Sequence, residues 1–146
     1  MIKLRSLACF LLVSLAGFAY AEDVSLRVEI TGLAEVQGTV FVSVYDNEDD
    51  WLGEATVVTE SVDITSALQE DAVVAELSLP PGDYAVSLFY DENDNGKLDS
   101  NFIGIPKEPV ALSNNAKPKF GPPKYKDAVF TLGAEGTIQR IAIESI

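Results

Sequence analysis

The residues best placed to do chemistry lie in one short polar stretch, DENDNGKLDSNF, at residues 91–102. Counted from its first residue, positions 1, 3, 5, 6, 7 and 9 are Asp91, Asn93, Asn95, Gly96, Lys97 and Asp99. The calcium loop of an EF-hand takes ligands from positions 1, 3, 5 and 9 and from the main-chain carbonyl of position 7, with glycine at position 6. The spacing therefore predicts that this loop binds Ca²⁺, with Lys97 contributing its carbonyl oxygen.

The pattern departs from an EF-hand at position 12, where Phe102 replaces the bidentate glutamate. Candidates for the missing ligand are Glu108, Asn101 and Glu92, or a water molecule. With this substitution we expect weak binding, with a dissociation constant on the order of 10⁻⁴ to 10⁻³ M. The alternative is a polar turn without metal, because Asp, Asn and Gly are also the residues of Asx-turns and hairpins.

Strands must position this loop, since apolar residues alternate with period two on both sides of it. The alternating segments are residues 24–30, 38–46, 72–79, 83–91, 128–132 and 137–146, with Gly- and Pro-rich turns between them. Residues 59–70 are ambiguous between a strand, a helical turn and a loop. The sequence predicts an all-β fold, a single antiparallel β-sandwich of about seven strands, transthyretin- or immunoglobulin-like, with a long connection at residues 91–126.

Residues 1–21 have the layout of a secretory signal peptide. Lys3 and Arg5 precede an apolar run at residues 7–18, and Ala-Tyr-Ala at residues 19–21 matches a small-x-small cleavage site. The apolar run is too short for a comfortable membrane span. We therefore expect an exported protein, periplasmic or extracellular, with one domain at residues 22–146 and no transmembrane segment after cleavage.

The composition limits the possible partners and chemistry. The chain has 23 acidic and 10 basic residues, and removal of Lys3 and Arg5 changes its formal net charge from −13 to −15. Such a charge repels nucleic acid and anionic lipid. There is no histidine, and Cys9 leaves with the predicted signal peptide, which excludes histidine and thiol catalysis, the usual zinc sites and disulfides. We expect a monomer that is not an enzyme.

Aromatic residues support a second hypothesis, a carbohydrate- or peptide-binding module of the cell envelope that uses Trp51, Phe120 and Tyr125. Trp51 follows an acidic cluster at residues 46–50 that could hold a second cation. The other two aromatic residues lie among five lysines, Lys107, Lys117, Lys119, Lys124 and Lys126. The rings could instead cap the core while the lysines balance the acidic surface. A third hypothesis is a structural component of an envelope assembly that docks through a strand edge.

Two resemblances bear on these hypotheses. The segments LPPGDYAVSLFYDENDNGKLDSNFIGIPKEP and SNNAKPKFGPPKYKDAVF resemble a bacterial exported family, domain of unknown function 2141. The resemblance extends from about Val24 onward, and the residues that carry it are Gly96, Asp99, Phe102, Gly104, Pro106 and Glu108. VALSNNA departs from it where an aromatic-Gly pair usually precedes SNNA. The resemblance implies a secreted β-sandwich without an established activity. DENDNGKLD is also similar to calcium loops in B-type repeats of bacterial surface adhesins, which supports a metal site.

Overall fold

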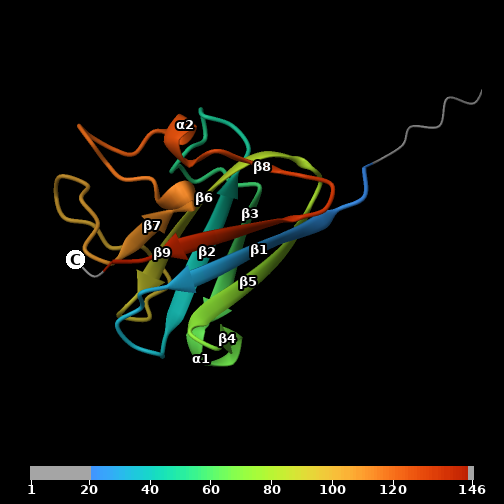
Figure 1. The fold of residues 1–146 in the computed structure, drawn as a ribbon. Coiled ribbons are helices and arrows are strands. Elements are labelled where there is room, and N and C mark those ends of the chain that lie inside the picture. Colours follow the sequence, from blue (N-terminus) through green and yellow to red (C-terminus); the bar gives the residue numbers. More distant parts are fainter. Residues whose placement is uncertain (1–20, 145–146) are drawn as a thin grey trace, which may run out of the picture.

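The computed structural model describes residues 21–144, and it shows two β-sheets packed against each other (Figure 1). The predicted signal sequence, apart from its last residue, and Cys9 lie outside this range. None of the helices within it is long and apolar enough to cross a membrane. The all-β prediction and the sandwich are confirmed.

The first sheet has the order β4-β5-β1-β9, and the second has the order β3-β2-β6-β7, with β8 paired to the first residues of β6. The strands of the first sheet are β4 (Leu68–Gln69), β5 (Ala72–Leu79), β1 (Val24–Thr31) and β9 (Thr137–Ala142). Those of the second are β3 (Val58–Asp63), β2 (Thr39–Tyr45), β6 (Gly82–Asp91), β7 (Val110–Leu112) and β8 (Phe130–Leu132). All pairs are antiparallel except β1 with β9, so the expected antiparallel sandwich contains one parallel pair.

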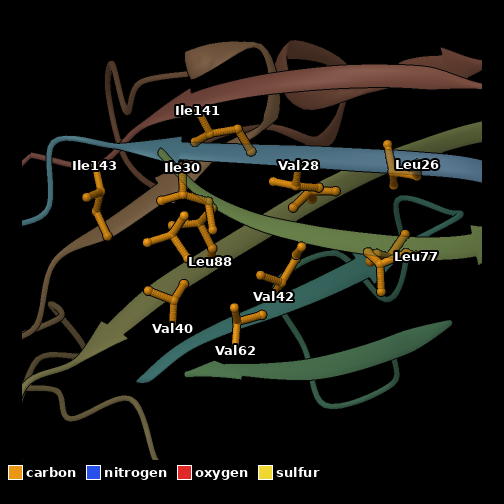
Figure 2. Close-up of a cluster of buried hydrophobic side chains, with 14 of the residues drawn as sticks. Leu26, Val28, Ile30, Val40, Val42, Val62, Leu77, Leu88, Ile141 and Ile143 are labelled. Carbon is orange, nitrogen blue, oxygen red and sulfur yellow. The ribbon is translucent and has the colours of Figure 1, made fainter. Parts of the chain in front are cut away.

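The core lies between the sheets and is built from the alternating apolar residues of the long strands (Figure 2). Val40 and Val42 of β2 and Leu88 of β6 meet Val28 and Ile30 of β1 across the interface. The opposite face of the second sheet carries Phe41 and Phe89, a cross-strand pair whose rings stack with centroids 4.9 Å apart. Burial of this apolar surface is the main favourable term in the folding of the sandwich.

Two segments are more regular than the sequence indicated. The ambiguous residues 59–70 form most of β3, one turn of helix α1 (Ile64–Ala67) and β4. Asp63 begins that turn by accepting a hydrogen bond from the Ser66 main-chain N–H, as an N-cap residue does. The predicted irregular connection at 91–126 contains β7, the 3₁₀ turn η1 (Ser113–Asn115) and the start of α2 (Tyr125–Ala128).

Candidate functional site

Asp91 is the last residue of β6 and the first residue of the polar loop. Its side chain is buried, with only 2% of the residue exposed. One carboxylate oxygen accepts a hydrogen bond from the Asn95 N–H at 3.2 Å, and the other accepts one from the Gly96 N–H at 2.7 Å. The turn that places these two N–H groups next to the Asp91 carboxylate needs a positive φ at Gly96. Its φ is 73°, which glycine adopts without strain. The loop therefore closes around a central carboxylate.

The two predicted amide ligands lie in the same loop. Asn93 and Asn95 both donate through Nδ2 to one oxygen of Asp99, at 2.6 and 2.8 Å. Their Oδ1 atoms accept main-chain hydrogen bonds from Asn95 and Lys97, respectively. The structure thus brings the alternate side chains of the loop together, and hydrogen bonds connect them.

Glu108 is the candidate for the missing ligand that lies against this loop. It is 3% exposed, and its two carboxylate oxygens accept hydrogen bonds from the main-chain N–H groups of Glu92, at 3.1 Å, and Asp99, at 2.9 Å. Two contacts bring the segment that contains Glu108 back to the polar loop. The Lys107 N–H donates to the Asp99 carbonyl, and Ser100 forms a β-bridge with Pro106. The carboxylate of Glu108 therefore connects the start and the end of the predicted calcium loop through hydrogen bonds.

The other two candidates are placed differently. Asn101 Oδ1 accepts hydrogen bonds from the N–H groups of Ile103 and Ile105, so it organises the next turn. Glu92 contributes its main-chain N–H to Glu108, and its own side chain is exposed. Glu108 is the better placed of the three.

The electrostatics of this loop are unusual. Asp91 and Glu108 are the buried acidic residues of the described chain, and neither is in an ion pair. Main-chain N–H groups are the partners of both carboxylates. No cluster of three or more Asp, Glu, His or Cys side chains with the geometry of a metal site occurs within residues 21–144. A cation would therefore need amide and carbonyl oxygens in addition to carboxylates.

Trp51, predicted as a possible sugar platform, belongs to a small internal cluster. Its ring packs edge-to-face with Tyr45, at 5.2 Å between centroids, and with Tyr125, at 5.8 Å. Its indole N–H donates to the Pro123 carbonyl at 2.9 Å. The Trp51 ring therefore packs between Tyr45 at the end of β2 and Tyr125 at the start of α2. Phe120 is fully exposed.

The lysines and the acidic cluster near Trp51 have few specific contacts. Among the five lysines, Lys117 forms an ion pair with Glu144 at 2.9 Å. In the acidic cluster, Asn47 donates to the carboxylates of Asp46 and Asp50 and accepts from the Asp50 N–H. This arrangement is a turn organised by Asn47.

The sequence did not indicate a groove of about 640 Å³ beside the loop. The connection between β1 and β2 forms one side of it, through Glu35, Gln37 and Gly38, and the end of β6 forms the other. Tyr90 lines it, although the alternation placed this residue simply in the core. Only the loop after β6 is rich in acids, and the β1–β2 connection has Glu35 alone, so no signal in the sequence pointed to this groove.

Comparison with known proteins gives one match. A family model described as "Uncharacterized protein conserved in bacteria (DUF2141)" matches residues 28–140. No curated protein and no solved structure matches the chain. The matched range covers β2 to β8, the second half of β1 and the first four residues of β9, and it includes the whole polar loop.

Proposed function

The chain belongs to this bacterial family, and we propose that it is an exported, non-enzymatic β-sandwich protein that binds Ca²⁺ in the loop after β6. Support for the loop comes from its geometry. Support for export comes from the amino-terminal sequence alone, and the absence of histidine and of a thiol in the expected mature chain favours a binding role over a catalytic one.

One observation carries the calcium proposal, namely two buried carboxylates that share a loop and have no cationic side chain as partner. A buried carboxylate is strongly unfavourable unless it is paired or coordinates a metal. Asp91 and Glu108 each have main-chain N–H partners only. The carboxylate of Asp99 adds a third negative charge to the loop and accepts hydrogen bonds from the amides of Asn93 and Asn95. A divalent cation would neutralise this excess of negative charge.

The donor set fits a hard cation that takes six to eight oxygens at flexible geometry. It comprises the carboxylates of Asp91, Asp99 and Glu108, the amide oxygens of Asn93 and Asn95, and the carbonyl of Lys97. Since no three acids within residues 21–144 are grouped as a metal site, these carboxylates would have to move closer together to reach one ion. Each amide oxygen that accepts a main-chain hydrogen bond keeps a second lone pair for a metal. The Nδ2 groups of Asn93 and Asn95 donate to Asp99, and these hydrogen bonds would have to break when a metal binds. Their loss is consistent with weak affinity for calcium.

Calcium would add a connection between the end of β6 and the segment that returns to β7. Binding to the folded state alone stabilises it by about 2.7 kcal/mol when free calcium is at a hundredfold excess over the dissociation constant. We expect the main effect of the ion to be a more rigid loop.

The test is thermal unfolding of the purified protein in EDTA and across a calcium titration, with magnesium as the comparison ion. Calcium should raise the melting temperature, with saturation at millimolar concentration. Asp91→Asn should abolish the rise, because it removes one charged ligand and leaves the volume of the side chain nearly unchanged. Asp49→Asn, in the turn near Trp51, has the same charge change and should retain the rise. An unchanged melting temperature for the wild-type protein at several millimolar calcium would exclude the site.

The alternative binding module would depend on Phe120, since Trp51 and Tyr125 pack against each other. Retention on a polysaccharide column that Phe120→Ala removes and EDTA leaves intact would favour this alternative.

A further inference from the structure

Residues 100–126, called the basic face below, carry a charge opposite to that of the protein as a whole. Between Asp99 and Asp127 the sequence has five lysines and one acidic residue, Glu108, which is buried. The lysines are all exposed, and they are Lys107, Lys117, Lys119, Lys124 and Lys126. Only Lys117 forms an ion pair within residues 21–144. The basic face is therefore locally positive on a chain with a formal net charge of −13.

Large apolar side chains are exposed on the same face. Phe102 and Phe120 are fully exposed, and Ile103 and Ile105 are exposed over more than half of their surface. Single exposed apolar residues are ordinary on a protein surface, whereas a group of them marks a site of interaction with a protein or a membrane. The basic face therefore combines positive charge with apolar area.

These apolar residues lie on two turns that project from the sandwich. Ile103 precedes Gly104 and Phe120 precedes Gly121, and the two glycines have positive φ angles of 81° and 104°. An added Cβ at either glycine would meet no atom within 4 Å, so both turns are open to solvent there. One turn comes before β7 and the other comes after η1, and Figure 1 shows both on the same side of the molecule.

The main chain of the first turn is largely hydrogen-bonded within the turn. The Asn101 N–H donates to the Ile105 carbonyl at 2.8 Å, and the Gly104 N–H donates to the Asn101 carbonyl at 3.0 Å. Asn101 Oδ1 accepts the N–H groups of Ile103 and Ile105, both at 3.0 Å. The next residue, Pro106, has no N–H. Because an unpaired N–H is costly in an apolar environment, this turn can enter one at lower cost than an open loop.

We propose that the basic face binds the surface of an anionic phospholipid membrane, with Phe102 and Phe120 inserted among the headgroups and the lysines close to the phosphates. Lysines near an anionic membrane are attracted to it, and inserted rings add apolar area that the lipid buries. The net charge of the protein alone predicts repulsion, but the field near a membrane depends on the face presented to it.

A protein partner fits these turns less well. Stable protein interfaces bury about 800 Å² on each partner, which projecting tips of a few residues do not offer, whereas lipid headgroups can rearrange around such tips. The proposal goes beyond calcium binding and does not depend on it.

Sedimentation with vesicles tests the basic face. The purified protein is mixed, at low ionic strength and in EDTA, with vesicles of phosphatidylcholine alone or of equal parts phosphatidylcholine and phosphatidylglycerol. It should sediment with the anionic vesicles and stay in solution with the neutral ones, and added salt should release it because salt screens the attraction. EDTA removes calcium, so a failure of the calcium proposal would leave this result unaffected.

One pair of variants tests the apolar contact. Phe102→Ser should weaken binding about tenfold, because it removes one large apolar side chain from the membrane. Val36→Ser, in the β1–β2 connection, is the control and should change the affinity less than about twofold. Both residues are exposed, so folding should persist in both variants.

A second pair tests the charge. Lys119→Gln should weaken binding about fivefold, the effect of one lysine at an anionic surface. Gln69→Glu makes the same change in net charge in β4, away from both turns (Figure 1), and should change the affinity less than about twofold.

Weaker binding by Phe102→Ser and Lys119→Gln, with both controls unaffected, would support the proposal. It is overturned if the protein does not sediment with anionic vesicles, or if Phe102→Ser binds as tightly as the wild-type protein. It is also overturned if Gln69→Glu weakens binding as much as Lys119→Gln, since net charge alone would then explain the attraction. Size-exclusion chromatography without lipid completes the test. A dimer that Phe102→Ser dissociates would assign the face to a second copy of the chain and overturn the membrane proposal.

Discussion

Asn93 illustrates how single side chains hold together the loop that we propose binds calcium. Its amide oxygen accepts the Asn95 N–H, and its amide nitrogen donates to Asp99 at 2.6 Å. The nitrogen stabilises the loop when no metal is bound, whereas the oxygen is the atom that a metal would use. The two functions therefore compete at one residue.

Asn93→Asp separates these two functions. Without metal, the variant loses a donor to Asp99 and places two carboxylates against each other, so its melting temperature in EDTA should fall. With metal, it gains a charged ligand, so calcium should bind about tenfold more tightly. Melting curves at several calcium concentrations measure both effects. An equal fall with and without calcium would show that no ion approaches this side chain.

Glu108 shows the limit of prediction from sequence at this scale. The spacing grouped the candidate ligands from Asp91 to Asp99, since residues within one short loop are close whatever the fold. Glu108 was one of three candidates, because its position depends on the β-bridge between Ser100 and Pro106. No local signal in the sequence indicates that bridge.

Among the elements, η1 joins parts of both sheets. Ser113 is fully buried, accepts the Val86 N–H of β6 and donates to the Ala128 carbonyl of α2. Asn114 donates to the Val129 carbonyl. Asn115 donates to the Arg140 carbonyl at 3.1 Å and accepts the Ala142 N–H at 2.8 Å. The side chain of Asn115 thus hydrogen-bonds main-chain groups on the edge of β9. Unpaired main-chain groups on a sheet edge can pair with a strand of another molecule.

Replacing Asn115 tests this edge contact. Asn115→Ala removes both hydrogen bonds and should lower the free energy of unfolding by about 1 to 2 kcal/mol. Asn115→Asp keeps the acceptor and tolerates the positive φ of 49°, so it should lose about half as much. Chemical denaturation measures the difference. If both variants unfold like the wild-type protein, the contact contributes nothing to stability.

The long strands were predictable because buried residues alternate with less buried ones along most of β1 and β2 and along the later residues of β5 and β6. β3 was ambiguous because Glu60 and Ser61 interrupt its apolar residues at the sheet edge. The three residues of β7 are too few to show a period, and they form a strand because β6 offers a free edge next to them. Both elements result from tertiary contacts rather than local propensity.

At the scale of the whole molecule, acidic residues greatly outnumber basic ones, and few of them have partners. Glu29 is an exception, held by the Nε atoms of Arg27 and Arg140, each at 3.0 Å. The hydrogen bond from Arg27 lowers the pKa of Glu29, and the charge of Arg140 lowers it further. This network joins β1 to β9 on the outer face of the first sheet.

The lowered pKa of Glu29 predicts a pH dependence. A carboxyl with a depressed pKa contributes stability above its unfolded value, near 4.5, and loses it as the pH falls through the folded value. Glu29→Gln should therefore melt below the wild-type protein at pH 7, and the two curves should converge toward pH 3. Melting temperatures across this range test the idea. A constant difference would show that the ion pairs contribute nothing.

The parallel pairing of β1 with β9 joins strands from opposite ends of the described chain, with Leu26 opposite Thr137. The first sheet therefore cannot be completed around β1 until β9 has been synthesised. Such a topology has a high contact order, and contact order slows folding. A chain that folds slowly stays extended while it is being made, which is the state that passage through a membrane channel requires. If the protein is exported, as we propose, the pairing of β1 with β9 would delay completion of the sandwich until β9 has crossed the membrane.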